Sequence, residues 1–472
     1  MTHDVVVIGA GPAGMAAAVT AAALGLKTLL LDEQPRPGGQ IYRNVGVVPA
    51  HVGKLLGADY LAGRRQVDRL AASGVEMRGN ALVWDVSRDL KITALQEGRV
   101  FQVQARQLIA ATGALERASP VPGWTLPGVM NAGAAQIAMK SGGSMPAGRI
   151  ALAGTGPLLL LVACQLLDAG AEVAALVETA EPGNRWAALK HLPAAFRAPG
   201  VLLKGLNMLR RLRKSGVPWF AGATDLQVLG AGRVSGVRFG CKGHSHSLAV
   251  DTLLLHHGVV PNHQLSRLLR VAHAWSPVQQ AWQVVCDAHG QTSLPGLRMA
   301  GDGVAIAGAA AAEASGALAA LGAAYALGCL GDTELRLRSA PCRKALARQA
   351  AVRPFLDVLY RPPAYITHPA DETVVCRCEE VTAGRIREMA ALGCVGPNQT
   401  KFFSRCGMGP CQGRVCGTVV TQILAASLGR TPDAVGAYRI RAPLKPVPLS
   451  ALAGLARQSS GEDLQPQGPP TR

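Results

Sequence analysis

Six of the eleven cysteines in this chain of 472 residues lie between positions 376 and 416. They form two runs, 376-CRC-378 and 406-CGMGPCQGRVC-416, with a lone Cys394 between them that we expect in the core. Such clustering favours a metal site over a disulfide framework and fits a reducing cytosol. Four thiolates hold either zinc or an iron–sulfur cluster. Paired zinc ligands usually have two or more residues between them, so the C-x-C pair favours iron and sulfur.

Two helices are expected to position these thiols. Thr382 has the residue type of an N-cap and precedes the helical stretch 383–393, and a second helix follows Gly413. Thiolates near helix N-termini have a lowered pKa and are stabilised as ligands. The spacing from Cys406 to Cys411 is the same C-x4-C as that from Cys411 to Cys416. Spacing alone therefore leaves open which pair binds.

A second pattern with chemical meaning opens the chain, 4-DVVVIGAGPAGMAAAVTAAALGLKTLLLDE-33. An apolar strand runs into a G-x-G-x-x-G turn, and an Ala-rich helix and a second strand follow. In a dinucleotide-binding fold these glycines make the tight turn, admit the pyrophosphate and let the helix pack on the strand, while the helix N-terminus supplies amide donors. The acid at the end of the second strand binds a ribose hydroxyl. The predicted nucleotide-binding residues here are Gly9, Gly11, Pro12, Ala13, Gly14, Asp32 and, as the neighbouring alternative acid, Glu33.

The same unit recurs at 149-RIALAGTGPLLLLVACQLLDAGAEVAALVE-178, with Gly154, Gly156 and the acid Glu178. The distance from first glycine to acid is 24 residues, against 23 in the first unit. Leu159 replaces the third glycine, which is expected to push the helix from the strand and to alter the phosphate seat. Glu178 favours NAD over NADP, because a carboxylate repels a 2′-phosphate and no Arg follows directly. The candidate occupants are NAD(H) or another adenine nucleotide, and an empty, degenerate site is the alternative.

The sequence lacks three other kinds of chemical site: a redox cysteine pair, a histidine metal site and a hydrolytic arrangement. Cys164 stands alone on an apolar helix, so flavin–disulfide exchange is not expected there. His256 and His257 are adjacent on a strand and point to opposite faces, which makes a poor metal site. We find no Ser-His-Asp or paired-carboxylate arrangement and assign no catalytic residue. The chain is predicted to move electrons and not to hydrolyse a substrate.

Charge and hydropathy exclude two further classes. The net charge is +18, but the Lys and Arg are scattered apart from 209-LRRLRKSG-216, and no nucleic-acid motif accompanies them. The charge thus indicates a basic surface or a face for an acidic partner. The apolar segment 5–31 lacks a basic start, and the segment 303–328 contains Glu313 among Ala and Gly. We predict a buried helix within 303–328, no transmembrane segment, and a cytoplasmic protein whose association with a membrane would be through partners.

Three further stretches carry a resemblance to a known family. The loop 37-PGGQIYR-43, the strand and loop 108-LIAATGALERASPVPGWTLPGV-129 and the segment 297-LRMAGDGVAIAG-308 together resemble the two-dinucleotide flavoproteins, which include thioredoxin reductase-like enzymes. The resemblance implies FAD in the first unit, with the Asp302 carboxylate on its ribityl or phosphate part. The segment 250-VDTLLLHHGVVPNHQL-265 is similar to the place where that family's chain crosses back to the FAD domain. The FAD-binding residues implied are Gly39, Gln40, Thr112, Gly113, Gly301 and Asp302.

The cysteine pattern has its own resemblance. C-x-C, about thirty residues and C-x4-C resemble the bacterioferritin-associated ferredoxin-like [2Fe–2S] domain. The ligands that this resemblance implies are Cys376, Cys378, Cys411 and Cys416, with Cys406 as the alternative fourth ligand.

The order of the domains, with 113-GALERASPVPGWTLPGVMNAGAAQ-136, resembles the alpha-type subunits of bacterial opine oxidases, D-hydroxyproline dehydrogenases and hydrogen cyanide synthases. This implies an α/β fold with FAD-type and NAD(P)-type Rossmann domains and a small helical [2Fe–2S] domain. The expected divisions are an FAD domain at 1–117 and 250–330, a nucleotide domain at 118–249, a connecting region at 331–372, the cluster domain at 373–440 and a tail at 441–472, disordered from Gln458.

The same resemblance implies an FAD-dependent oxidoreductase subunit. A separate FAD-containing beta subunit, similar to D-amino-acid oxidase, oxidises a secondary amine. Electrons then pass through the FAD and the cluster of the present chain to a quinone or another acceptor. The motifs are compatible with two alternatives, a self-sufficient NADH-dependent flavin and iron–sulfur reductase and a non-catalytic scaffold subunit.

Overall fold

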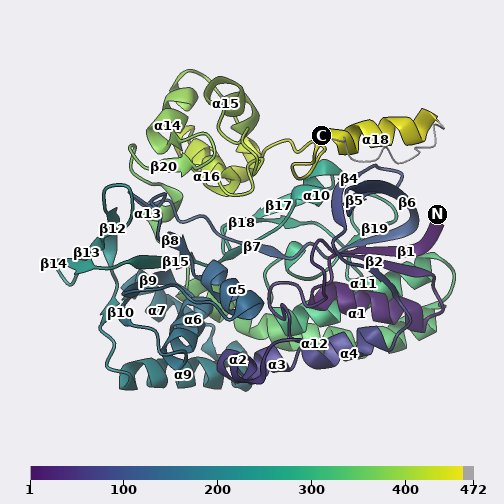
Figure 1. Ribbon diagram of the computed structural model, residues 1–472, viewed down its shortest axis with the longest axis horizontal. Coiled ribbons are helices and arrows are strands. Elements are labelled where there is room, and N and C mark those ends of the chain that lie inside the picture. The colour runs from purple at the N-terminus through teal and green to yellow at the C-terminus, as the bar shows by residue number, and fades with distance from the viewer. Residues whose placement is uncertain (1, 461–472) are drawn as a thin grey trace, which may run out of the picture.

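The computed structural model describes residues 2–460, and it shows two α/β units side by side with the cysteine-bearing domain above them (Figure 1). The first unit is built on a sheet in the order β3-β2-β1-β6-β5-β4, with β19 paired to β6. Its strands are β1 Thr2–Ile8, β2 Thr28–Leu31, β3 Glu76–Arg78, β4 Leu82–Val86, β5 Lys91–Gln96, β6 Arg99–Ala110 and β19 Leu297–Met299. The pairs of β1 with β2 and β6 are parallel, whereas β4 and β5 are antiparallel additions.

Two small-residue helices pack against each other beside this sheet, α1 (Pro12–Ala23) and α11 (Ala309–Ala326). A Cβ added at Gly316 would lie 1.9 Å from the carbonyl oxygen of Ala13, so the two backbones are in direct contact. This explains the Ala- and Gly-rich composition of both segments, because only such residues allow so close an approach. The prediction of a buried helix within 303–328 is confirmed.

The second unit has a parallel sheet in the order β11-β10-β9-β15-β8. Its strands are β8 Val129–Asn131, β9 Ile150–Thr155, β10 Val173–Glu178, β11 Trp219–Ala221 and β15 Thr252–His257, and its helices are α5 Ala132–Gly142, α6 Pro157–Asp168, α7 Pro182–Leu189, α8 Leu192–Ala195 and α9 Pro199–Lys214. A three-stranded antiparallel sheet follows, β12 Thr224–Leu229, β13 Gly236–Cys241 and β14 His244–Ala249.

Strand β15 corrects one expected boundary. The division at 249/250 assigned this strand to the FAD domain, but its six residues pair with β9 and β8 in the second sheet and are all buried. A central parallel strand is apolar on both faces in either sheet, so its composition could not show to which sheet it belongs. The chain crosses back after His257, where β16 (Val259–Pro261) pairs with β7 (Ala114–Glu116).

The remaining elements connect these units. They are α2 Ala50–Leu56, α3 Ala58–Leu61, α4 Arg64–Ala71, α10 Gln264–Leu268, β17 His273–Ser276, β18 Ala281–Val284, the 3-10 turn Gly301–Gly303, α12 Asp332–Leu359 and α13 Ala364–Thr367. The long helix α12 fills most of the predicted connecting region and packs on α7, α8 and α11.

The cysteine domain contains β20 Val374–Cys376, β21 Val381–Thr382, α14 Ala383–Ala391, α15 Pro397–Ser404, α16 Gly417–Ser427 and α17 Pro432–Val435. The hydroxyl oxygen of Thr382 accepts a hydrogen bond from the N–H of Arg385 at 3.3 Å, which confirms the predicted N-cap. Helix α15 was not predicted. Its Phe402 and Phe403 are largely exposed, so it lacks the apolar periodicity that identifies a helix in a sequence.

The segment after residue 440 returns to the first sheet. The N–H of Leu444 donates to the carbonyl of Trp84 at 2.6 Å, and Lys445 forms an ion pair with Glu33. Helix α18 (Leu449–Ser460) then packs Ala451 against Trp84 and Val100. The predicted disorder from Gln458 is wrong for 458–460, which are helical, and 461–472 lie outside the described residues.

Within residues 2–460, no helix has the length and apolar character needed to cross a bilayer.

Candidate cofactor sites and cysteine cluster

The first glycine loop is closed by its own backbone. Gly9 has a φ of +101°, and a Cβ there would lie 2.4 Å from the carbonyl oxygen of Ala111. A Cβ at Gly14 would lie 1.7 Å from the carbonyl oxygen of Gly9, so α1 sits directly on the loop. A Cβ at Gly11 would meet only the Cα of Gly39, at 3.8 Å. The loop therefore has free space at Gly11, the position where a pyrophosphate approaches the backbone.

The start of α1 fits an anionic ligand as well. Gly11 is its N-cap and gives no side-chain hydrogen bond, and Pro12 occupies the first turn, where no N–H is needed. The first-turn amides thus remain available as donors, at the positive end of the helix dipole. This chemistry fits the pyrophosphate of FAD, with the N–H groups of Ala13 and Gly14 as donors and Pro12 as the first residue of the helix.

Asp32 is bonded to the loop itself. Its Oδ2 accepts from the N–H of Ala10 at 2.5 Å and its Oδ1 from the N–H of Gln34 at 2.7 Å, and burial raises the pKa of this carboxyl. Glu33 is exposed and pairs with Lys445. Both oxygens of Asp32 therefore accept hydrogen bonds from the backbone of the loop region in which we expected the acid to bind a ribose. Which of the two acids binds the ribose stays a prediction.

The three segments attributed to FAD lie at this loop. Residues 37–43 reach it at Gly39, where a Cβ would lie 2.7 Å from the Cα of Gly11, and the other two meet beside α1. A Cβ at Gly301 would lie 2.8 Å from the Cβ of Ala13, and one at Gly303 would lie 3.0 Å from the hydroxyl oxygen of Thr112. The first glycine loop, the Ala-Thr-Gly strand end and the Gly-Asp-Gly turn are therefore in direct contact. Their role toward FAD stays a prediction. Gly113 belongs to the same contact, since its backbone nitrogen lies 3.4 Å from the same Cβ position at Gly303.

Asp302 closes the turn before α11. Its Oδ1 accepts from the N–H groups of Ala307 and Gly308, at 2.9 and 3.0 Å. One carboxylate oxygen is thereby held by the backbone, and Oδ2 is the oxygen left for a ribityl hydroxyl. The role of Asp302 toward FAD stays a prediction.

Lys140 links the two units and was missed in the sequence. Its Nζ lies on α5 and donates to the carbonyl of Gln40 at 3.0 Å and to Oε1 of Gln136 at 2.8 Å. Burial, with a smaller contribution from Arg43, lowers the pKa of this ammonium to about 7. A lysine on an Ala-rich helix gives no sequence signal of burial, because most lysines are exposed.

The second glycine loop has different surroundings. A Cβ at Gly154 would lie 1.8 Å from the carbonyl oxygen of His256, and one at Gly156 would lie 3.2 Å from two ring atoms of the same histidine. Nδ1 of His256 is 2.6 Å from Oε1 of Glu116, whose carboxylate also accepts from the N–H of Gly133 at 2.9 Å. An imidazole therefore stands at the position that corresponds to free space beside Gly11. Leu159, in the place of the third glycine, is fully buried.

Glu178 is covered by two side chains. Its Oε2 accepts from Nη2 of Arg185 at 3.0 Å and from Nε1 of Trp219 at 3.2 Å. No arginine follows Glu178 directly in the sequence, but α7 places Arg185, seven residues later, on the carboxylate. The charge argument for NAD over NADP is therefore weaker than the sequence indicated.

Two smaller predictions concern residues near the second loop: that His256 and His257 point to opposite faces of their strand, and that Cys164 is a core residue. The ring of His257 lies between the hydroxyls of Ser119 and Thr179, at 2.8 and 3.2 Å, on the face opposite to the partner of His256. Burial lowers the pKa of His257 to about 3, so the imidazole is neutral. Cys164 is a buried core residue of α6, as expected.

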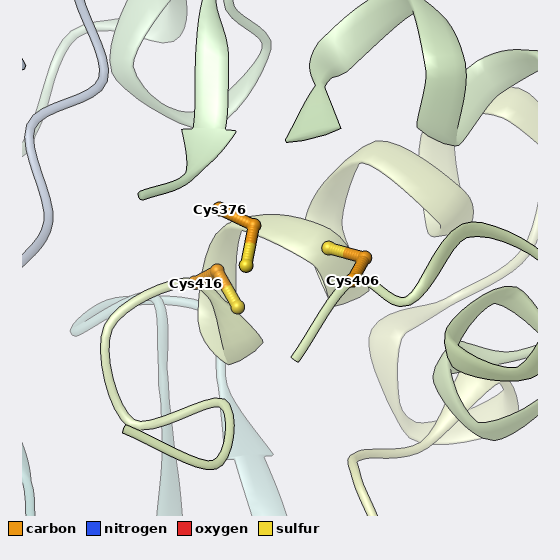
Figure 2. Close-up of side chains that lie close together, drawn as sticks. All are labelled: Cys376, Cys406 and Cys416. Carbon is orange, nitrogen blue, oxygen red and sulfur yellow. The ribbon is translucent and has the colours of Figure 1, made fainter. Parts of the chain in front are cut away.

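Three cysteines converge in the small domain. The sulfur atoms of Cys376, Cys406 and Cys416 lie within 4.8 Å of one another, and all three side chains are buried (Figure 2). Cys376 ends β20, Cys406 follows the left-handed C-cap of α15, and Cys416 is the N-cap of α16. The thiols of Cys406 and Cys416, together with the N–H of Gly407 at 3.5 Å, lower the pKa of Cys376 to about 2. This is a set of soft ligands that a metal or cluster could bind.

Cys378 and Cys411 form a neighbouring pair. Burial and the nearby sulfur of Cys411 raise the pKa of Cys378, and a Cβ at Gly409 would lie 2.1 Å from the Cβ of Cys378. The loop that carries Cys411 therefore lies directly on the C-x-C turn. Of the predicted ligands, Cys376 and Cys416 share one group with Cys406, whereas Cys378 and Cys411 stand beside that group. The choice between Cys406 and Cys416 stays a prediction.

Two aromatic residues hold the cysteine loops in place. The hydroxyl of Tyr438 donates to the carbonyl of Cys406 at 2.8 Å, and its ring leaves no room for side chains at Gly407 and Gly413. Nε1 of Trp124 donates to the carbonyl of Val374 at 2.6 Å and joins the second unit to the strand that ends at Cys376. Both are long-range contacts, which no local pattern in the sequence could reveal.

Two known protein families match separate parts of this chain. Residues 3–317 match the pyridine nucleotide-disulphide oxidoreductase family, and residues 370–455 match the sarcosine oxidase A3 domain. The second match includes the segment that returns to the first sheet, beyond the expected domain end at 440. The class defined is thus a two-dinucleotide flavoprotein with an added cysteine-bearing domain.

Relatives that match nearly the whole chain identify its family within this class. The chain is 43% identical to the A subunit of the opine oxidase of Agrobacterium tumefaciens, over 96% of this chain and 92% of that protein. It is 33% identical to the HcnB subunit of the hydrogen cyanide synthase of Pseudomonas aeruginosa, over 96% of this chain and 99% of that protein. The chain therefore belongs to the family of opine oxidase A subunits, which are flavin-dependent oxidoreductases.

Among solved structures, L-proline dehydrogenase from P. horikoshii has the same fold, with a TM-score of 0.69, 18% identity, and coverage of 96% of this chain and 79% of that one.

Proposed function

We propose that this chain is the electron-transferring subunit of a heteromeric amine dehydrogenase or oxidase. A partner subunit with its own FAD, similar to D-amino-acid oxidase, would oxidise an opine, a hydroxyproline-type imino acid or glycine. The chain would pass the electrons between that subunit, its own FAD and a [2Fe–2S] cluster. When bound, FAD exchanges electron pairs and single electrons, and the cluster exchanges single electrons.

The observation that carries this proposal is the convergence of thiols in a domain attached to a flavoprotein body. Cys376, Cys406 and Cys416 form a buried group, and Cys378 and Cys411 lie beside it. Trp124 ties the strand that ends at Cys376 to the second unit. Relatives that match nearly the full chain are named as subunits of an opine oxidase and of hydrogen cyanide synthase, which supports a heteromeric assembly.

The residues of the chain have separate tasks in this proposal. The first glycine loop and the start of α1 bind the pyrophosphate, while Asp302 and Thr112 orient the part of FAD that follows it. Burial of Cys376, Cys406 and Cys416 excludes water from the cluster, because all three side chains are less than 2% exposed. We do not expect a cysteine pair in the second unit to compete for flavin electrons, because Cys164 forms no disulfide within residues 2–460.

The first experiment determines cofactor content. The full-length chain from iron-replete cells should contain one FAD, two iron atoms and two sulfide ions per chain, with visible bands beyond those of flavin. Cys411→Ala should remove the iron. Cys394→Ala, a buried cysteine that follows α14 at a distance from the group, should retain it and serves as the control. A protein without iron or flavin would support the scaffold alternative.

The same preparation identifies the fourth ligand. If Cys416 binds, Cys416→Ala loses the cluster and Cys406→Ala keeps it. The reverse result transfers the role to Cys406.

A second experiment tests the direction of electron flow. NADH added to the purified chain alone should reduce the flavin slowly, whereas the proposed FAD-containing beta subunit, with its amine substrate, should reduce it rapidly. Rapid bleaching by NADH alone would replace the subunit proposal with a self-sufficient NADH-dependent reductase.

A further inference from the structure

A small pocket lies where the cysteine domain meets the flavoprotein body. One wall comes from α10 and the residue before it, with β18 behind them, and the other from the end of the cysteine loop and the start of α16. The side chains that matter for its chemistry are His263, Gln264, Arg267, Trp282, Arg414 and Thr418. Neither the nucleotide loops nor the thiol group uses this pocket.

The pocket contains buried donors without a partner. Nε and Nη2 of Arg267 and Nε1 of Trp282 have no hydrogen-bond acceptor anywhere in residues 2–460. Trp282 is only 4% exposed. Buried N–H groups in native proteins are almost always paired, and a charged donor is the costliest to leave unpaired. Three such donors on two adjacent side chains indicate an acceptor that is not part of the chain.

The two donor side chains are held rigidly. The guanidinium of Arg267 lies 4.4 Å from the centre of the Trp282 ring, a cation–π arrangement that fixes both groups. The charge of Asp433 acts on Arg267, but the Asp433 carboxylate accepts from the N–H of Trp275 at 2.9 Å, and the described residues form no ion pair with Arg267. The arginine is therefore placed for a ligand and is not neutralised by the protein.

The opposite wall adds positive potential. Helix α16, of 11 residues, begins at Gly417 and has no side-chain cap, and Gly417 and Thr418 line the pocket. The N-terminus of such a helix favours an anion. Arg414 donates to the carbonyls of Cys411 and Leu444, so it contributes charge while its bonded N–H groups hold the cysteine loop.

From this arrangement we infer that the pocket binds a small oxyanion, a carboxylate or a phosphate group, held by the Arg267 guanidinium and the indole N–H of Trp282 together. The site is independent of the proposed electron route. It is placed between two functional segments, because Asn262 on its wall donates its N–H to the carbonyl of Gly113, and Arg414 on the other wall belongs to the loop between Cys411 and Cys416. A bound anion would join the flavoprotein body to the cysteine domain.

Calorimetric titration of the full-length protein tests the site, with inorganic phosphate and acetate as probes at constant ionic strength. At least one probe should bind saturably with one site per chain. Arg267→Gln should weaken that binding at least ten-fold, the size expected for a charge-assisted hydrogen bond. Arg238→Gln removes the same charge from an exposed position on β13 and should leave binding unchanged. This control separates the site from general attraction by the basic surface.

A second variant guards against a folding defect. Trp282→Phe keeps an aromatic ring under the guanidinium and removes only the N–H donor, so it should weaken binding several-fold. Binding by phosphate alone would assign a phosphate group, and binding by acetate alone a carboxylate. Failure of both probes to bind saturably, or equal binding by the wild type and both variants, would overturn the inference and leave buried water as the occupant. None of these results depends on whether the chain transfers electrons.

Discussion

The two glycine-rich loops have nearly the same sequence spacing, but different groups face them. Beside Gly11 only the Cα of Gly39 lies within 4 Å of a built Cβ, whereas beside Gly156 the ring of His256 is 3.2 Å away. The histidine is oriented by Glu116, 140 positions earlier in the chain. A repeated motif thus fixes the turn and the following helix, while residues remote in sequence decide what space remains for a ligand.

The acids at the ends of the two second strands differ in the same way. Asp32 accepts two backbone N–H groups of its own loop region, and Glu178 is covered by Arg185 and Trp219. The first acid therefore holds the backbone of its own loop, whereas the second acid is bonded to two side chains of the protein. The comparison supports the first loop as the FAD-binding loop. The second loop departs from the dinucleotide-binding pattern in the groups that surround it.

The largest effect is expected from Gly14→Ala. The new Cβ would lie 1.7 Å from the carbonyl oxygen of Gly9, so α1 must move away from the loop. We expect loss of bound flavin and of about 3 kcal/mol of unfolding free energy, as for an overpacked core. Flavin absorbance after gel filtration and urea unfolding measure the two effects.

The matched control is Gly183→Ala on α7, where a Cβ would meet nothing within 4 Å. It should retain flavin and stability. A Gly14→Ala protein with a full complement of flavin would remove the distinction between the loops.

Local spacing was sufficient to predict much of this fold. It predicted both glycine loops, the Thr382 cap, the core position of Cys164 and the helix within 303–328, since each depends on neighbouring residues alone. Contacts between distant residues gave no such signal. The burial of Lys140, the position of His256 beside Gly156 and the sheet to which β15 belongs all depend on tertiary packing. The grouping of Cys406 with Cys376 and Cys416 could not be deduced either, because two identical C-x4-C spacings overlap.

The contact that joins the two units should produce a pH dependence of stability. Burial lowers the pKa of Lys140 to about 7 from 10.5, so between these values the unfolded chain binds more protons than the folded one. Stability should therefore rise with pH across this window, by on the order of 2 kcal/mol. Lys140→Met cannot titrate and should lose this slope. Urea unfolding at intervals from pH 7 to pH 10 compares the two proteins.

The control for this prediction is Lys54→Met, which removes an exposed lysine from α2 and should keep the wild-type slope. If Lys140→Met shows the same rise with pH as the wild type, another group causes it, and the ammonium of Lys140 is not the buried charge between the units.

The smallest effect concerns the second glycine loop. Whether the affinity for NADH rises or falls tests the comparison between the two loops. His256→Ala removes the ring beside Gly156, and Glu116→Gln in the same protein avoids an unpaired buried carboxylate. If the imidazole only fills the phosphate seat, calorimetry should show NADH binding about ten-fold more tightly, or about 1.4 kcal/mol. Glu116→Gln alone is the control and should change the affinity less. Weaker binding by the double variant would mean that His256 contacts the phosphate, and the second loop would then be a nucleotide seat of a different kind.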